Sequence, residues 1–508
     1  MPRKEFKIMQ LKNLLEIIDY TEITNRSGID VNSTEVKKIC SHSNDANSDC
    51  AFVCIAGSLV DSHDKKYVSG AYGKGCRVFI VQKPIEAPDD AFVITVKDSR
   101  IALALLSAAF FDYPANKMTL IGITGTKGKT TSSLLIYNVL KSNGIPAGYI
   151  GSNGISYNDV WKETLNTTPE SYFLHEHLKT MYDEGIRTVV MEVSSQALKM
   201  ARVHGIKFDI GVFTNLSPDH IGEFEHPDFN DYKACKHSLF TDYGVKYIVY
   251  NADDEYSSEM TSGSRAEKVG ISKNGEKNAA YRAEDICFYR TASKIAVNFK
   301  CIEDSESYDV DLSFPGDFSV YNALTAIAVC KRLGLNTEQI VNTMKNIRIE
   351  GRFETYALPN EATVVIDYAH NGVSLKAALT ALREYSPSRL ICLFGSVGGR
   401  TKMRRAELGL VASRDADFCI LTSDNPDNEP PAAIIAEIAS YFTTGSCPYV
   451  AITDRKEAIQ HALSISERGD IILLAGKGHE NYQLICGRRE KFSEAQIIKE
   501  YCESYEKV

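Results

Sequence analysis

The chain has 508 residues, of which 44% are hydrophobic and 24% charged, and its formal net charge is −9. A single core stops growing at roughly 250 to 300 residues, so this length predicts several domains. The acidic balance argues against a general nucleic-acid binder, which needs an extended basic surface. The 13 Cys contain no CxxC pair, which is typical of free thiols in a reducing cytosol and disfavours a zinc site.

The first section of the chain has the pattern of a small α/β domain. Its start, MPRKEFKIMQLKNLLEIIDY, lacks the long apolar segment of a signal peptide, and no apolar run in the chain approaches the roughly 20 residues that span a bilayer. Between residues 50 and 97, short apolar runs alternate with turn-rich pieces, and a helical pattern follows over 100–111. We therefore predict a cytoplasmic protein without a membrane span.

The second section begins near Lys117 with the strand pattern MTLIGIT, followed by a Gly-rich loop and the helical pattern TSSLLIYNVLKSNG. RTVVMEV, DIGVFTNL and YIVYNAD read as further strands, as expected for a doubly wound parallel sheet. A helix is predicted around 321–333, and Asn336 with Gln339 resembles a capping box that starts another.

After Gly351 and Arg352 the alternation restarts with the strand patterns TVVIDYAH, RLICLFGS, DFCILTSDN and DIILLAGKG, each ending in a polar or Gly-rich loop. The predicted fold class is therefore α/β with three domains. These are a small N-terminal α/β domain over 1–115, a central doubly wound domain of the P-loop ATPase type over 116–350, and a C-terminal Rossmann-like domain over 351–508.

The segment GITGTKGKTT, residues 122–131, is the strongest local signal for chemistry. A Gly-rich turn between strand and helix points backbone N–H groups at phosphate oxygens, while a lysine reaches the outer phosphates and a hydroxyl binds Mg²⁺. Lys129 and Thr130 fit these last two roles. A helix cap with an incidental lysine is the plainer alternative, and the strand and helix on either side disfavour it.

The loop departs from the usual Walker pattern, because Ile123 stands where that pattern has its first Gly. The shorter GTKGKTT resembles the ATP loop of the Mur ligases and of the folate polyglutamate ligases, which form amide bonds through an acyl phosphate. LNTTPES, MEVSSQALKMARVHG and TNLSPDHIGEFEHPDFNDYKACKHSLF follow it. Together these segments resemble the Mur ligase family, in the branch that adds the third peptide residue of peptidoglycan precursors.

The resemblance implies ATP and Mg²⁺ as cofactors. Without the motifs, these residues would have plainer interpretations. Glu192, at a strand end, would more often be solvated, and His220 of SPDH would be a capping or core residue. Lys236 of YKACK would be an ordinary surface lysine. The motifs instead imply catalytic roles, and carbamoylation of Lys236 to an anion that holds Mg²⁺, with Asp219 able to orient His220. The implied catalytic residues are Lys129, Glu192, His220 and Lys236, the metal ligands Thr130, Glu192, His220 and Lys236, and the ATP contacts Gly125, Thr126, Lys127, Gly128, Lys129, Thr130, Thr131, Asn322, Arg352 and Asp367.

For the UDP-MurNAc-L-Ala-D-Glu substrate, the resemblance implies contacts from hydroxyls and one guanidinium, which suit a pyrophosphate, sugar and carboxylate ligand. Met200 stands where some relatives have Gln, and His42 and Asn44 replace the commoner Asp and Arg of the uridine-binding start. The implied contacts are Ser43, His63, Asn166, Thr167, Thr168, Ser194 and Arg202. Those for the incoming amino acid are Arg400, Asp424, Asn425, Asp427, Gly476 and Glu480.

The stretch TSDNPDNEPP, residues 422–431, bears on which diamino acid is added. Family members that add meso-diaminopimelate typically carry DNPR, whose Arg pairs with the second carboxylate, and Asp427 stands in its place here. An acid there favours the distal ammonium of L-lysine, unless Arg404 or Arg405 supplies the missing fork. The alternatives are the same reaction with meso-diaminopimelate, a folate polyglutamate ligase, and a non-catalytic nucleotide-binding homologue. Relatives imply a monomer.

Overall fold

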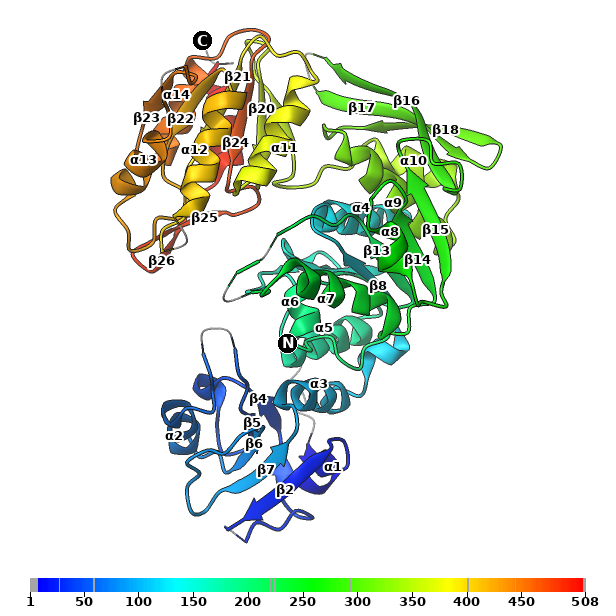
Figure 1. Ribbon diagram of the computed structural model, residues 1–508, viewed down its shortest axis with the longest axis vertical. Coiled ribbons are helices and arrows are strands. Elements are labelled where there is room, and N and C mark those ends of the chain that lie inside the picture. Colours follow the sequence, from blue (N-terminus) through cyan, green and yellow to red (C-terminus); the bar gives the residue numbers. More distant parts are fainter. Residues whose placement is uncertain are drawn as a thin grey trace. The chain divides into compact units, whose positions relative to one another are not determined.

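The computed structural model describes residues 8–26, 28–57, 60–219, 221–222, 225–291, 294–399, 402–443 and 445–505 (Figure 1). The chain divides into two compact units, one ending at Ile271 and the other beginning at Ser272, and each is described by itself. Every helix within the described ranges is too short or too polar to span a bilayer.

The first unit opens with a five-stranded sheet in the order β2-β7-β6-β5-β4. Its pairs are parallel except for β2, which lies antiparallel to β7 at the edge. The strands carry buried runs such as Cys50–Val53, so both faces are covered. The elements are β1 (Met9–Gln10), α1 (Leu11–Leu15), β2 (Tyr20–Asn25), β3 (Glu35–Val36), β4 (Lys38–Cys40), a 3₁₀ turn (Ser43–Asp45), β5 (Cys50–Val53), α2 (Lys65–Gly73), β6 (Val78–Val81), β7 (Phe92–Val96), α3 (Ser99–Phe110) and a 3₁₀ turn (Pro114–Lys117).

The same unit continues with strands in the order β11-β10-β9-β12-β8-β13-β14-β15. The run from β9 to β15 is parallel, with β10 and β11 added as an antiparallel hairpin. This confirms the doubly wound parallel sheet. The elements are β8 (Thr119–Thr124), α4 (Lys129–Ser142), β9 (Ala147–Gly151), β10 (Gly154–Tyr157), β11 (Val160–Lys162), α5 (Ser171–Asp183), β12 (Thr188–Glu192), α6 (Ser195–Lys199), β13 (Ile210–Phe213), α7 (Phe229–Thr241), β14 (Tyr247–Asn251), α8 (Ser257–Thr261) and β15 (Glu267–Ser272).

The second unit begins with a three-stranded antiparallel sheet, β16-β17-β18, followed by two helices. The helix after this sheet is almost wholly buried, and the next one begins with the predicted capping box between Asn336 and Gln339. The elements are β16 (Tyr281–Arg290), β17 (Ile295–Glu303), β18 (Glu306–Leu312), α9 (Phe318–Arg332) and α10 (Thr337–Met344).

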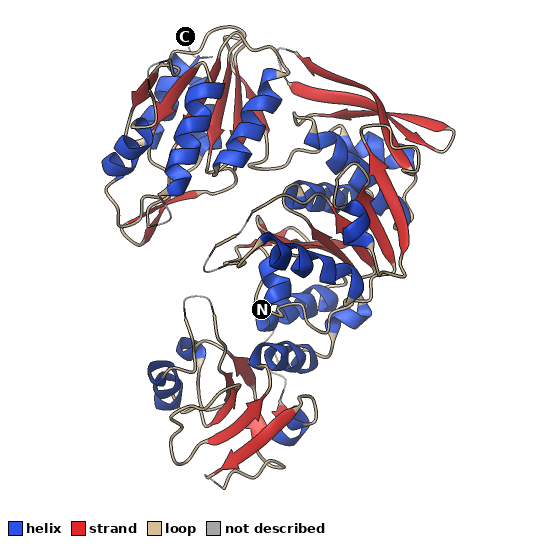
Figure 2. Ribbon diagram, in the orientation of Figure 1, coloured by secondary structure: helices blue, strands red, loops and turns tan. Residues whose placement is uncertain are grey.

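A six-stranded sheet in the order β19-β20-β24-β21-β22-β23 completes the second unit, with only β19 antiparallel to its neighbour. Helices cover both of its faces, as Figure 2 shows. A short hairpin of β25 and β26 follows β24. The elements are β19 (Glu354–Ala357), β20 (Thr363–Asp367), α11 (Gly372–Arg383), β21 (Leu390–Phe394), α12 (Met403–Asp415), β22 (Phe418–Leu421), α13 (Pro431–Ala439), β23 (Tyr449–Ala451), α14 (Arg455–Ser464), β24 (Ile471–Ala475), β25 (Tyr482–Ile485), β26 (Arg488–Lys491) and α15 (Glu494–Tyr505).

Candidate active site

The Gly-rich loop joins β8 to α4 at the carboxyl end of the parallel sheet, where open α/β folds bind ligands. Gly125 and Gly128 have φ of 146° and 83°, values that L side chains rarely adopt. A Cβ on Gly125 would lie 1.9 Å from Oγ1 of Thr214, so a neighbouring strand end fills the space beside this residue. The Nζ of Lys129 donates to the carbonyl oxygens of Gly125 at 2.8 Å and Thr126 at 3.0 Å.

Residues that follow β13 hold the loop in shape. The backbone N–H of Lys127 donates to Oδ1 of Asn215 at 2.9 Å, and Nδ2 of Asn215 donates back to the Lys127 carbonyl at 3.0 Å. The N–H of Thr126 donates to the Asn215 carbonyl at 2.8 Å. Asn215 was not among the predicted site residues. The available signal was a polar residue near the end of the predicted strand DIGVFTNL.

Lys236 lies against the same loop. Its side chain is 1% exposed, its Nζ donates to the Gly125 carbonyl at 2.8 Å, and the Nζ lies 4.5 Å from the centre of the Tyr232 ring. Burial and the positive charge of Lys129 hold the pKa of Lys236 well below its ordinary range, with Asp219 acting in the opposite direction. The structure therefore places two lysine amines on one carbonyl oxygen of the loop.

Glu192, at the end of β12, has a carboxylate that is fully buried. Its Oε1 accepts from the Tyr149 hydroxyl at 2.8 Å and the Ser152 N–H at 2.9 Å, and its Oε2 accepts from the Thr130 hydroxyl at 2.9 Å. Within the described ranges its hydrogen-bond donors are all neutral, including a longer contact from the Ser152 hydroxyl at 3.3 Å. An ionised carboxylate buried among neutral donors has its charge balanced only when a cation lies beside it.

The pair formed by Thr130 and Glu192 fits Mg²⁺. This ion takes oxygen ligands at about 2.0–2.1 Å in octahedral geometry, so two adjacent ligand oxygens lie roughly 2.9 Å apart. The Oγ1 of Thr130 and the Oε2 of Glu192 are 2.9 Å apart. His220, also predicted as a metal ligand, lies outside the described residues, and Asp219 forms an ion pair with Lys127 at 3.1 Å.

Most of the predicted UDP-substrate residues gather beside Glu192. The Thr168 hydroxyl donates to the Glu192 carbonyl at 2.8 Å, and Thr167 meets Ser152 at 2.9 Å between hydroxyl oxygens. Ser194 caps α6 by accepting from the Ala197 N–H at 3.2 Å. Arg202 contacts the Thr168 carbonyl at 3.2 Å and Glu170 at 2.7 Å, and Asn166 is exposed next to them.

The two UDP-substrate contacts predicted in the N-terminal sheet region, Ser43 and His63, differ in burial and in hydrogen bonding. Ser43 begins a 3₁₀ turn and is half-buried. His63 is buried, with Nδ1 2.6 Å from Oδ1 of Asp61 and Nε2 accepting from the Gln82 N–H at 3.2 Å. Both ring nitrogens of His63 are therefore occupied within the protein, so a direct contact with substrate would require one of these bonds to break.

Three predicted ATP contacts belong to the second unit. Asn322 is buried in α9, and the guanidinium carbon of Arg352 lies 4.6 Å from the centre of the Tyr368 ring. Asp367 ends β20 and accepts from the N–H groups of Phe353 at 3.1 Å and Ala369 at 2.9 Å. Burial raises the pKa of Asp367, while Arg352 opposes this rise. Their roles toward ATP stay predictions.

Several residues predicted to bind the incoming amino acid meet at a lysine that was not among the predicted site residues. Lys477 is 0% exposed, and its Nζ donates to Oδ1 of Asn425 at 2.9 Å and to Oε2 of Glu480 at 2.7 Å. Asp424 lies 3.9 Å from the same Nζ, and a Cβ on Gly476 would be 3.0 Å from its Oδ2. The position of Lys477 in the Gly-rich end of the predicted strand pattern DIILLAGKG, next to Gly476, was the available signal. Arg400 lies outside the described residues.

Asp427 is held by the β25–β26 hairpin. It has φ of 50°, its Oδ1 accepts from the Gly487 N–H at 2.8 Å, and its backbone pairs with Leu484 and Cys486. Arg405, one proposed substitute for the missing Arg, is buried and forms ion pairs with Glu429 at 2.6 Å and Glu437 at 2.7 Å. Both side chains are thus engaged within the protein, which weakens the charge argument for L-lysine and the proposed use of Arg405.

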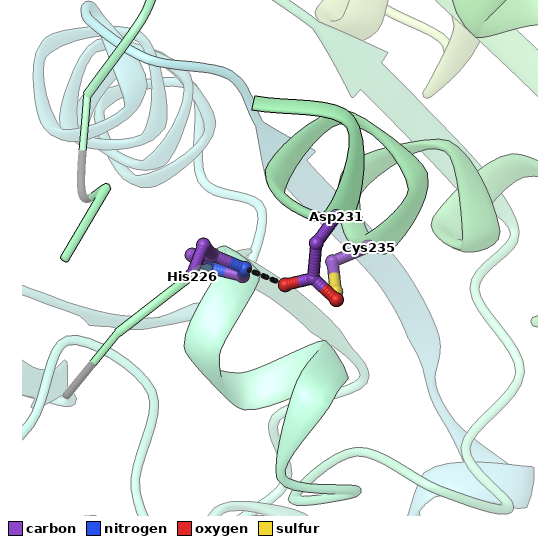
Figure 3. A group of neighbouring side chains, drawn as sticks. All are labelled: His226, Asp231 and Cys235. Atoms are coloured by element: carbon purple, nitrogen blue, oxygen red, sulfur yellow. Dashed lines mark hydrogen bonds and ion pairs between the residues drawn. The ribbon is translucent and has the colours of Figure 1, made fainter. Parts of the chain in front are cut away.

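A cluster of His226, Asp231 and Cys235 lies at the start of α7 (Figure 3), with candidate ligand atoms all within 4.8 Å of one another. The Nδ1 of His226 is 2.6 Å from Oδ2 of Asp231, whereas two ligands on one tetrahedral zinc lie roughly 3.3 Å apart. Asp231 also pairs with Lys199 at 2.7 Å. The cluster is a hydrogen-bonded anchor that ties the helix carrying Lys236 to α6, where Ser195 contacts Nε2 of His226 at 2.9 Å.

A Gly-rich loop, a buried carboxylate and two lysines at the carboxyl edge of a parallel sheet define a nucleotide-phosphate site. Residues 123–330 match the Mur ligase middle domain, and residues 351–478 match the Mur ligase glutamate ligase domain. A UDP-N-acetylmuramoyl-L-alanyl-D-glutamate–2,6-diaminopimelate ligase from Caldanaerobacter subterraneus subsp. tengcongensis is 38% identical, covering 98% of this chain and 100% of that protein.

The ligase of the same name from Clostridium perfringens is 34% identical, over 97% of this chain and 100% of its own length. A solved structure of a 2,6-diaminopimelate ligase of this kind superimposes with a TM-score of 0.67 at 24% identity, covering 98% of this chain and 99% of that one, and so shares the fold. The chain belongs to the Mur ligase family of ATP-dependent amide ligases, in its tripeptide-synthetase branch.

Proposed function

We propose that the chain joins a diamino acid to the D-Glu side-chain carboxylate of UDP-MurNAc-L-Ala-D-Glu, using ATP and Mg²⁺, in the synthesis of peptidoglycan precursors. The observation that carries this is the buried Glu192 carboxylate beside Thr130 at the first turn of α4, with Lys129 and Lys236 on the adjoining loop. The names of the relatives supply the substrate. No residue of the chain need form a covalent intermediate.

In this mechanism the chain mainly neutralises charge and aligns reactants, as in phosphoryl transfer generally. The N–H groups of the Gly-rich loop and Lys129 would bind the phosphates of ATP. Thr130 and Glu192, with His220 and a carbamoylated Lys236, would hold Mg²⁺, which when bound neutralises phosphate charge. The D-Glu carboxylate would attack the γ-phosphate and release ADP, and the amine of the diamino acid would then displace phosphate from the acyl phosphate to form the amide.

For the diamino acid we favour meso-diaminopimelate. Relatives that match nearly the whole chain are named for it. The Asp427 carboxylate, on which the prediction of L-lysine depends, accepts a hydrogen bond from the Gly487 N–H. L-Lysine is the second candidate, because Asp427 still stands where family members that add meso-diaminopimelate typically carry Arg.

We assign one ligand to each predicted domain. Residues 1–115 would bind the UDP-substrate, and residues 116–350 would bind ATP. Residues 351–508 would bind the incoming amino acid through Asp424, Asn425, Gly476 and Glu480. We also propose that the protein is a cytoplasmic monomer.

A ligation assay tests the proposal directly. Purified protein, ATP, Mg²⁺ and UDP-MurNAc-L-Ala-D-Glu would be supplied with meso-diaminopimelate, L-lysine, L-ornithine or lanthionine, and the UDP-tripeptide would be identified by mass. We expect product with meso-diaminopimelate at the highest kcat/KM. Product with L-lysine alone would reverse the choice of amino acid. Phosphate release only with a folate and glutamate would support the folate alternative, and no turnover with any of these would support a non-catalytic homologue.

A further inference from the structure

The Glu192 carboxylate is held by a tyrosine that no motif contains. Tyr149 lies in β9 and is 1% exposed, and its hydroxyl donates to Oε1 of Glu192 at 2.8 Å. The same hydroxyl oxygen accepts from the Asn153 N–H at 3.3 Å, which orients the O–H bond toward the carboxylate. We propose that Tyr149 is a positioning residue that fixes Glu192 for metal binding and thereby sets the affinity for Mg²⁺.

The two carboxylate oxygens have different surroundings. Oε1 receives the Tyr149 hydroxyl and the Ser152 N–H, so its lone pairs are used by groups of β9 and the turn after it. Oε2 receives the Thr130 hydroxyl from the first turn of α4, on the side of the Gly-rich loop, and the Ser152 hydroxyl at the longer distance of 3.3 Å. Tyr149 therefore holds the carboxylate by one oxygen and directs the other toward the proposed metal partner.

The strand end is shaped to allow this contact. A Cβ on Gly151 would lie 2.2 Å from Oε1 of Glu192 and 2.3 Å from the Tyr149 hydroxyl oxygen. Only glycine at this position leaves room for both atoms. The tyrosine ring is itself placed by packing, since its centre lies 6.1 Å from that of Tyr137.

The expected change in metal affinity follows from the general behaviour of groups that hydrogen-bond to metal ligands. Groups that hydrogen-bond to a metal ligand orient it and tune its basicity, and their removal typically weakens metal affinity by about 10- to 100-fold. Without the Tyr149 hydroxyl, Oε1 keeps a single donor, the Ser152 N–H, and the carboxylate gains rotational freedom about its last bond. This inference rests on the proposed metal site at Thr130 and Glu192, and the experiment separates the two.

Mn²⁺ binding to the ADP-loaded full chain, followed by electron paramagnetic resonance, would be compared for the wild type, Tyr149→Phe and Tyr137→Phe. Tyr137 is the matched control, because its hydroxyl contacts Ser156 at 3.0 Å and not Glu192. We expect Tyr149→Phe to weaken Mn²⁺ binding by about 10- to 100-fold, with Tyr137→Phe unchanged. In the ligation assay, half-saturation should need more Mg²⁺, while kcat at saturating Mg²⁺ should recover.

Equal Mn²⁺ affinity for Tyr149→Phe and the wild type would overturn the inference and leave the proposed function intact. Equal Mn²⁺ affinity for Glu192→Gln and the wild type would overturn the metal site itself. Gly151→Ala provides a second variant, because its methyl group would displace both the carboxylate and the hydroxyl. It should weaken Mn²⁺ binding at least as much as Tyr149→Phe, and undiminished binding would likewise count against the inference.

Discussion

Lys236 donates a hydrogen bond from its buried Nζ to the carbonyl oxygen of Gly125, at 2.8 Å. Lys129 donates to the same oxygen at the same distance, so two amines share one acceptor. Burial and the nearby charge of Lys129 lower the pKa of Lys236, and the neutral amine is the form that attacks CO₂. Attack forms the N–C bond of a carbamate and releases one proton to solvent.

If Lys236 carries this carbamate, Lys236→Ala should lower kcat by roughly 10²- to 10³-fold, the usual cost of removing one charge-stabilising group. Added formate or acetate should restore part of the activity, because a small carboxylate can occupy the vacated position. Lys233→Ala is the control on the same helix, since Lys233 pairs with Glu259 at 2.9 Å. Activity of Lys236→Ala equal to that of the wild type would rule out the carbamate.

Gly125→Ala should abolish ATP binding and lower the free energy of unfolding. The added Cβ would lie 1.9 Å from Oγ1 of Thr214 at a φ of 146°, so the loop must move away from the strand end that shapes it. Gly144→Ala is the matched control, because its φ of 76° imposes strain but nothing lies within 4 Å. It should cost only about 1 kcal/mol and leave ATP binding intact. Isothermal titration calorimetry measures ATP binding, and denaturant unfolding measures the free energy of unfolding. Equal losses of both in Gly125→Ala and Gly144→Ala would contradict the steric argument.

His175 should make the fold sensitive to acid. It is 1% exposed on α5, neither ring nitrogen has a hydrogen-bond partner among the described residues, and burial lowers the pKa of His175 to about 4. In the unfolded chain this histidine has a pKa of about 6.5, so it binds a proton more readily there than in the folded protein. Stability is therefore unaffected above that pH and falls as the pH drops from about 6.5 to 4, by up to roughly 3 kcal/mol.

Urea unfolding at a series of pH values would measure this loss. His175→Leu should reduce the slope between pH 6.5 and 4, because leucine has no proton to take up. His42→Gln, at an exposed position, should keep the wild-type slope. Identical pH dependence for His175→Leu and the wild type would show that another group causes the acid sensitivity.

Asp427→Asn should separate the charge of this side chain from its structural role. Asparagine keeps an oxygen that can accept from the Gly487 N–H, but it removes the negative charge. We expect the ratio of kcat/KM for meso-diaminopimelate over L-lysine to stay within about five-fold of wild type, because a half-exposed charge contributes at most about 1 kcal/mol. A larger shift toward meso-diaminopimelate would restore the charge argument. Asp427→Ala should instead loosen the hairpin and lower kcat/KM for both amino acids.

Much of the fold followed from local patterns. The strands of the central sheet were predicted because each is a short apolar run with a helical pattern nearby, and the capping box at Asn336 and Gln339 was legible from two residues three apart. The Gly-rich loop was equally legible, because positive φ and close backbone approach both require glycine there.

The partners of the candidate site were not legible in the same way. Tyr149 and Ser152 contact Glu192 across sequence separations of 43 and 40 residues, and Lys477 contacts Asn425 across 52 residues. No periodicity links such positions, since parallel strands become neighbours only when the sheet forms. Asp427 is the clearest example. Its negative charge is evident from the sequence, but its contact with Gly487, 60 residues away, is not.

Residue types at short, fixed spacings were sufficient to predict the class of fold, the family and the phosphate loop. The contacts between side chains became visible only in the folded protein: Lys129 and Lys236 share one carbonyl oxygen, Glu192 is buried among neutral donors, and Asp427 is bonded to a hairpin. These contacts could not be predicted because burial, pKa and hydrogen bonding depend on distances between segments remote in the chain, and those distances are set only when the sheets pack into their cores.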